Sequence, residues 1–158
     1  MKKIIVPLLC ILFLLTSCSA GTDNLKSYWN YREYFGISYL TIMHKSSDKE
    51  TKIGESVLET AQKVFTYVGD EKDADKNVGE LYRYYAFVKA PLEVKSSEAK
   101  LELITTKITG NRGEMWVEYS RMAAYVNEEG GYGGEALCLW KLKKTDGKWI
   151  VTGVKETA

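Results

Sequence analysis

A strand-like segment over residues 114–126 carries the side chains best suited to chemistry in this chain. Because the side chains of a strand alternate between its two faces, Glu118 and Arg121 must point to opposite sides. One of them therefore faces the helices that would cover a sheet. A charged side chain buried alone is costly and needs a partner, so the inward residue is a candidate for a functional role. The alternative is that the face carrying it is open to water.

Tyrosines near this segment suggest contact with a ligand or a partner protein. A tyrosine combines an apolar ring with a polar hydroxyl, which suits pocket linings and interfaces. Tyr119 and Tyr125 share the strand face of Arg121, and Tyr132 lies in the glycine-rich stretch 128–134. Glycines permit close backbone approach, so this stretch is interpreted as a lip over a binding site or, alternatively, as a flexible hairpin tip. The predicted contact residues are Tyr119, Arg121, Tyr125 and Tyr132.

No catalytic residue, metal or cofactor is predicted. The only histidine, His44, precedes a polar break and is expected at the surface, and no matched acid–base set is evident. Asp73, Asp75 and Asn77 match the first three ligand positions of an EF-hand loop. The match then fails, because the positions that need glycine and a bidentate glutamate carry other residues. The sequence therefore favours a solvated turn here and a protein that is not an enzyme.

The N-terminus carries a second chemical signal. Two lysines precede an apolar run over residues 4–15, and the segment Leu15-Thr16-Ser17-Cys18 follows. This combination is typical of a secretory signal, and it resembles the lipobox of bacterial lipoprotein precursors. The resemblance implies cleavage before Cys18, acylation of its thiol with palmitate-type chains, and anchoring in the cell membrane on the extracytoplasmic side. The alternative is an ordinary secretory signal that is cut nearby.

The composition of the remaining chain limits its function. Without residues 1–17, the chain has 141 residues, enough for one domain with a core. Lys+Arg falls from 22 to 20 against 21 Asp+Glu, so the net charge becomes −1, which argues against a nucleic-acid partner. Residues 18–24, with the lipidated cysteine, form a small polar tether. Cys138 is then the one thiol of the folded part, so no internal disulfide is expected.

Hydrophobic periodicity predicts helices before the middle of the chain. Residues 25–48 form an aromatic-rich segment with a helical stripe, which packs on the domain or, alternatively, contacts the membrane interface. Residues 53–68 form the clearest amphipathic helix, and a shorter helix over 78–88 ends before Pro91, with Tyr84 facing outward.

After Pro91 the period changes from 3.6 to 2. Strands are predicted at about 98–109, 114–126, 135–144 and 148–155, with a tight hairpin at Asp146-Gly147. The predicted fold class is therefore α+β, with N-terminal helices packed on a curved four-stranded antiparallel meander in a domain over residues 49–158.

The last predicted hairpin carries a family resemblance. In residues 139–151 an Asp-Gly-Lys-Trp turn joins two strands, and this resembles the last hairpin of nuclear transport factor 2-like, or cystatin-like, cone domains. The order of helices before the meander also fits, and the resemblance covers about residues 50–158. It implies a strongly bent sheet whose helices close a cavity. Members of that superfamily include isomerases, dehydratases, non-catalytic subunits and secretion-system components, so the fold alone does not choose the function.

Taken together, these observations predict a membrane-anchored, non-catalytic module that binds a small apolar ligand or an envelope protein. One alternative is an accessory subunit of an envelope secretion or conjugation machine. A large apolar outer sheet face would favour that role, and a homodimer through the same face is a further expectation. The other alternative is a cone-fold enzyme with Glu118 or Arg121 inside, which an inward charge with a hydrogen-bonded partner would favour.

Overall fold

The structure is a computed structural model of the whole chain, and it describes residues 32–90, 92–126 and 129–157. The chain divides into two compact units, residues 1–39 and residues 40–158. The signal segment, the tether and the lipidated cysteine predicted from the sequence lie outside the described residues. Within the described part, no helix is long and apolar enough to cross a membrane.

The described end of the aromatic-rich segment is helical, but mostly not α-helical. Residues 32–35 are α-helical, and the 3-10 helix η1 follows over Gly36–Met43. Gly36 has a φ of 66°, a value that glycine adopts without steric cost, and it stands where the α-helix ends. The helix predicted over residues 25–48 is therefore confirmed only as helical structure from residue 32 to residue 43, with residues 25–31 outside the described part.

The long helix α3 spans Asp48–Phe65 and begins five residues earlier than predicted. The polar run before residue 53 is its first turn, because Ser47 and Glu50 form a capping box in which each side chain binds the other's backbone N–H. The apolar stripe then packs on the sheet. Gly54 makes that approach close, since a Cβ there would lie 2.2 Å from Thr106 Oγ1.

The helix predicted over residues 78–88 is wrong as a single element. After the short 3-10 helix η2 (Glu71–Asp73), the chain forms the 3-10 helix η3 (Gly79–Tyr84) and a four-residue α-helix, α4 (Ala86–Lys89). Tyr85 between them has extended backbone. A 3-10 helix has three residues per turn, so Leu81 and Tyr84 share one face. Tyr84 is consequently buried, with 1% of its surface exposed, and does not face outward as predicted.

The sheet is the antiparallel meander that the sequence predicted, in the order β1-β2-β3-β4. Its strands are β1 (Val94–Thr109), β2 (Arg112–Tyr125), β3 (Gly131–Thr145) and β4 (Lys148–Glu156). Asp146 and Gly147 have φ values of 51° and 82°, the left-handed pair that a two-residue hairpin turn requires. β4 pairs only with residues 138–145 of β3, so the first part of β3 lies beyond the end of β4.

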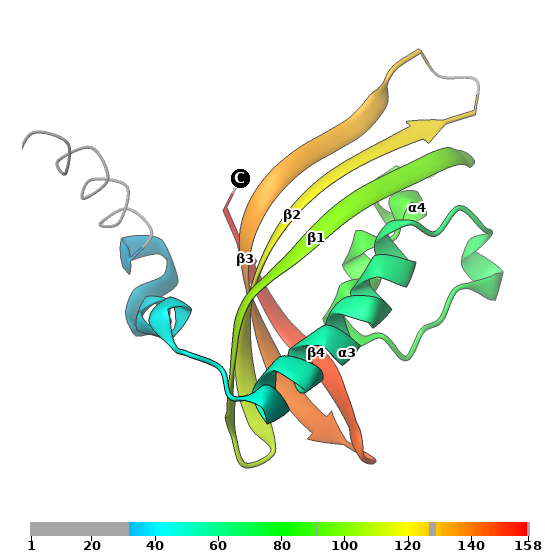
Figure 1. Cartoon of the computed structure of the whole chain (residues 1–158). Coiled ribbons are helices and arrows are strands. Elements are labelled where there is room, and N and C mark those ends of the chain that lie inside the picture. The colour runs from blue at the N-terminus through cyan, green and yellow to red at the C-terminus, as the bar shows by residue number, and fades with distance from the viewer. Residues whose placement is uncertain (1–31, 91, 127–128, 158) are drawn as a thin grey trace, which may run out of the picture. The chain divides into compact units, whose positions relative to one another are not determined.

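Helices α3 and α4 lie on the same side of the sheet, as Figure 1 shows. The main core lies between them and the sheet and includes Phe65, Leu81, Tyr84, Met115 and Trp140. The coarse α+β class is thereby confirmed. Side chains from the helical layer also bind the edge strand β1, since Gln62 Nε2 donates to Ala99 O and the backbone N–H of Ile108 donates to Glu50 Oε1. These bonds occupy backbone groups that an edge strand otherwise leaves open.

Candidate functional site

The structure decides which charge of β2 points inward. Arg121 faces the helices and is only 5% exposed, whereas Glu118 lies on the outer face and is exposed. The helix-facing residue opposite Arg121 on β1 is Ala99, and on β3 it is Gly134. Of the two candidates named from the sequence, Arg121 is therefore the inward one.

Arg121 joins the helical layer to the sheet. Its Nη1 donates to the backbone carbonyl of Tyr84, and its Nη2 donates to Ser97 Oγ at 3.1 Å. The guanidinium carbon lies 5.4 Å from the centroid of the Phe65 ring. Burial lowers the pKa of Arg121. The Nε atom has no hydrogen-bond partner among the described residues. Through the other two nitrogens, Arg121 ties the last residue of η3 to strand β1.

A second polar cluster in the interior was missed by the sequence reasoning. Glu156 Oε2 accepts hydrogen bonds from Tyr84 at 2.6 Å and from Tyr119 at 3.4 Å, and the thiol of Cys138 lies 3.8 Å away. Burial raises the pKa of both tyrosines, and it raises the pKa of Cys138 to about 12. These three groups are therefore protonated donors at neutral pH. The thiol is buried, as expected of a small hydrophobe, and is not a nucleophile in this setting.

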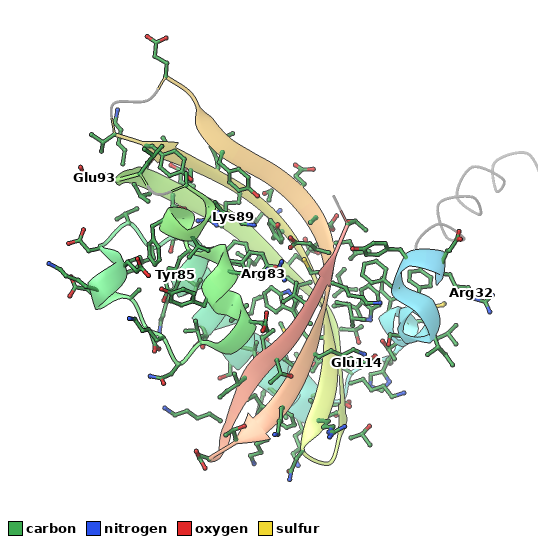
Figure 2. The ribbon with its side chains drawn as sticks, turned by 180° about the vertical axis from the view of Figure 1, so that it is seen from behind. Arg32, Arg83, Tyr85, Lys89, Glu93 and Glu114 are labelled. Carbon is green, nitrogen blue, oxygen red and sulfur yellow. The ribbon has the colours of Figure 1, made fainter. Side chains whose placement is uncertain are left out.

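Tyr125 and Tyr132 meet at the opposite end of the helix-facing side from the β3–β4 turn. They line a hollow of about 260 Å³ with Lys89 and Leu92, and Lys89 Nζ lies 5.9 Å from the centroid of the Tyr132 ring. Figure 2 shows Lys89 on the short helix α4, at this end of the sheet. Tyr132 is 40% exposed, whereas Tyr125 is buried and donates to Ala86 O at 3.2 Å. Of the four predicted contact residues, Tyr125 and Tyr132 therefore share this hollow, whereas Tyr119 and Arg121 do not line it.

A larger hollow, of about 630 Å³, lies on the outer face of the sheet. The register of the strands builds it. Lys107, Glu114 and Lys141 form one row across β1, β2 and β3, and Arg112 and Lys143 are partners in the row next to the hairpin turn. Side chains two residues apart on a strand point to the same face. Arg112 and Glu114 on β2, and Lys141 and Lys143 on β3, therefore share the outer face. We name this set, with Thr41, Thr109 and Thr152, the outer-face hollow.

The outer-face hollow carries an excess of positive charge. It contains four cationic side chains and one carboxylate, Glu114. Glu114 Oε1 accepts from Lys141 Nζ, and its Oε2 accepts from Thr41 Oγ1 at 2.8 Å (Figure 2 labels Glu114). In the described part of the chain, Lys107, Arg112 and Lys143 have no ion pair. Three cations around a hollow without a matching carboxylate can bind an anion.

The other end of the same outer face has the opposite charge. Two hollows there, of about 160 and 500 Å³, are lined by two cationic residues, Lys100 and the inward Arg121, and by four glutamates, Glu98, Glu102, Glu118 and Glu135. Between the two ends, Trp116 and Leu139 are buried although they point outward. The Trp116 indole Nε1 donates to Thr41 Oγ1 at 2.8 Å. The exposed apolar side chains on or beside this face include Met122 and Ile104.

Comparison with protein-family models, with curated proteins and with solved structures finds no match for this chain. His44 is less exposed than predicted, since its Nε2 lies 3.2 Å from Glu50 Oε2. No group of three His, Cys, Asp or Glu side chains among the described residues is placed to hold a metal ion.

Proposed function

We propose that this protein is a non-catalytic binding module, anchored by lipid on Cys18 to the extracytoplasmic side of a cell membrane. The support for the anchor is the charged start, the short apolar run and the lipobox-like segment. The support for a module with its own core is the set of large side chains packed between helices and sheet. The α+β class and the meander agree with a nuclear transport factor 2-like cone domain, which remains part of this proposal.

The observation that carries the binding role is the outer-face hollow. The core between the helices and the sheet is filled by aromatic rings such as Phe65, Tyr84 and Trp140, whereas the outer face of the sheet carries a hollow of about 630 Å³. Its three cations without an ion pair among the described residues, Lys107, Arg112 and Lys143, match the acceptor oxygens of an anionic ligand. The proposal therefore replaces the expected apolar ligand with an anionic one.

Titration calorimetry with inorganic pyrophosphate tests this role. The protein is the processed chain, residues 18–158, with Cys18→Ser to remove the lipid. The double variant Arg112→Gln, Lys143→Gln should weaken binding about tenfold, because each exposed charge contact contributes on the order of 0.5–1 kcal/mol. The matched control Lys89→Gln, Lys100→Gln removes the same charge elsewhere and should bind like the parent chain. Equal affinities of parent and double variant would reject the hollow as the site.

Catalysis is the second candidate function, and one feature of the interior favours it, an inward charge with hydrogen-bonded partners. Arg121 is an inward charge with hydrogen-bonded partners, and Glu156 receives two phenol hydroxyls nearby. Native mass spectrometry of the processed chain, purified gently from its own host, tests this role. A retained small organic molecule that is lost in Tyr119→Phe would favour an interior site. A ligand-free chain would leave the outer-face hollow as the supported site.

A further inference from the structure

We propose that the end of the sheet formed by the β1–β2 and β3–β4 turns docks on the anionic phosphate headgroups of the membrane that holds the lipid anchor. The inference rests on the proposed function, because the outer-face hollow forms part of this docking end. It goes beyond that function by naming the ligand and by including a second basic surface on the other side of the sheet.

The second surface lies between α3 and the β3–β4 hairpin. A hollow of about 620 Å³ is lined there by the first turns of α3 and by the helix-facing side chains Lys144 and Trp149. It contains three lysines, Lys49, Lys52 and Lys144, against the single carboxylate of Asp48. All three lysines are exposed, and none has an ion pair within the described residues. We name this set the inner-face hollow.

The two hollows stand on opposite faces of the same strand. Successive residues Lys143 and Lys144 of β3 point to opposite sides, Lys143 into the outer-face hollow and Lys144 into the inner-face hollow. Together the hollows carry seven cationic side chains and two carboxylates. One small anion cannot contact both faces of a sheet, whereas an extended anionic surface can meet the whole end. This distribution favours a headgroup layer over a single soluble phosphate.

An aromatic side chain at the same end fits this ligand. Trp149 is half-buried at the start of β4, directly beside the turn, and lines the inner-face hollow with the apolar Ile53. Tryptophan and lysine together are typical of surfaces at the membrane–water interface, because the ring is apolar and its N–H reaches polar headgroups. The far end of the outer face, with Glu98, Glu102 and Glu118, would be repelled by the same layer.

The position of the anchor permits this contact. Thr41 lines the outer-face hollow and lies at the start of the unit that contains the sheet. Counting from Cys18 to Thr41 gives a connection of roughly 23 residues, which spans at most about 80 Å when extended. A connection of this length is long enough for the docking end to contact the surface of the membrane that holds the anchor.

Vesicle flotation tests the inference. The lipid-free chain, residues 18–158 with Cys18→Ser, should float with vesicles of phosphatidylcholine containing phosphatidylglycerol, and should not float with phosphatidylcholine alone. Binding should fall steeply between low and high salt. The triple variant Lys49→Gln, Lys52→Gln, Lys144→Gln should bind the anionic vesicles about a hundredfold more weakly, at about fivefold per lysine. The matched control Lys89→Gln, Lys95→Gln, Lys100→Gln should bind them like the parent chain.

Each result separates the inference from the proposed function. The triple variant leaves the outer-face hollow intact, so its pyrophosphate affinity should be unchanged while its vesicle binding is lost. Absence of flotation with anionic vesicles at low salt would overturn the inference and leave pyrophosphate binding standing. An equal loss of vesicle binding in the triple variant and in the control would mean that net charge alone causes the binding, and this result would also overturn the inference. Complete displacement from vesicles by inorganic phosphate, at matched ionic strength, would assign the site to the free ion.

Discussion

Replacement of Glu50 should affect stability in a pH-dependent way, because its carboxylate joins three parts of the fold. Oε2 accepts from the backbone N–H and the hydroxyl of Ser47, both at 2.9 Å, and lies near His44 Nε2. Oε1 accepts from the backbone N–H of Ile108 at 2.9 Å. The capping of α3, the loop before it and the edge of β1 therefore all depend on one charged group.

The size of the effect follows from the pKa of Glu50. Backbone hydrogen bonds from Ser47 and Ile108 lower that pKa from 4.5 to about 2. At 1.36 kcal/mol per pKa unit this difference corresponds to a ceiling of about 3 kcal/mol. The side chain is still 15% exposed, so solvent reduces the contribution, and Glu50→Gln should cost on the order of 1–2 kcal/mol of unfolding free energy at pH 7.

The pH dependence has a definite sign. A carboxyl group with a lowered folded-state pKa stabilises the protein above its unfolded-state pKa and loses that contribution as pH falls through the folded-state value. Urea unfolding of the parent chain and of Glu50→Gln should therefore differ most at pH 7 and converge between about pH 4.5 and pH 2. Glu55→Gln, an exposed site on the same helix, is the control and should match the parent throughout. A constant difference down to pH 2 would refute the electrostatic reasoning.

Three further predictions concern packing and reactivity. Gly79→Ala should cost on the order of 1–3 kcal/mol more in urea unfolding than Gly110→Ala, because both glycines have positive φ but only at Gly79 would a Cβ meet Val151 O, at 2.3 Å. Ser97→Ala should cost on the order of 1–3 kcal/mol, and the exposed Ser96→Ala almost nothing, since Ser97 Oγ binds Arg121 and Phe65 O. In the lipid-free chain, Cys138 should react with a disulfide reagent about a thousandfold more slowly when folded than when unfolded in urea, because its pKa rises from 9.0 to about 12. Equal rates would contradict the burial of that thiol.

The strands were predictable because their signals are local. Alternation of apolar and polar residues predicted four strands, and Asp146-Gly147 predicted the turn between the last two. The observed strands begin up to four residues earlier than predicted, as at β1, where residue 94 is already paired. These added residues include Lys95 and Ser96, whose polar character carries no strand signal. Ser96 is in the sheet because it pairs with Ala124 of β2, and Lys95 lies at a register shift between the paired residues 94 and 96.

The helical region was harder to predict because two helix types share similar spacings. Apolar residues at 78, 81, 82 and 85 fit a 3.6-residue period, yet the backbone there follows a three-residue period and then extends at Tyr85. For that reason Tyr84 lies in the core and not on the outer side, where the sequence predicted it. The start of α3 was placed too late because Ser47 and Glu50 look like loop residues unless their reciprocal hydrogen bonds are considered.

The outer-face hollow lay beyond the sequence reasoning for a different reason. Lys107, Arg112, Lys141 and Lys143 belong to three strands, and only the register brings them together. A bulge between residues 103 and 105 of β1 shifts the alternation of that strand, so the face of Lys107 cannot be read from residues 98–103. For Arg121, by contrast, the alternation of β2 already places it on the face opposite Glu118. The structure adds that the helices cover the face of Arg121.

Net charge concealed the feature that carries the proposed function. A processed chain with 20 basic and 21 acidic residues gave no reason to expect a polyanion as partner. The charges are separated, however, with four cations and one carboxylate at one end of the outer face, and two cations and four glutamates around the hollows at the other end. Charges farther away than the Debye length of about 10 Å are largely screened, so an ion close to one end responds mainly to the charge of that end. An anion near the basic end therefore experiences attraction that the sum over the chain does not reveal.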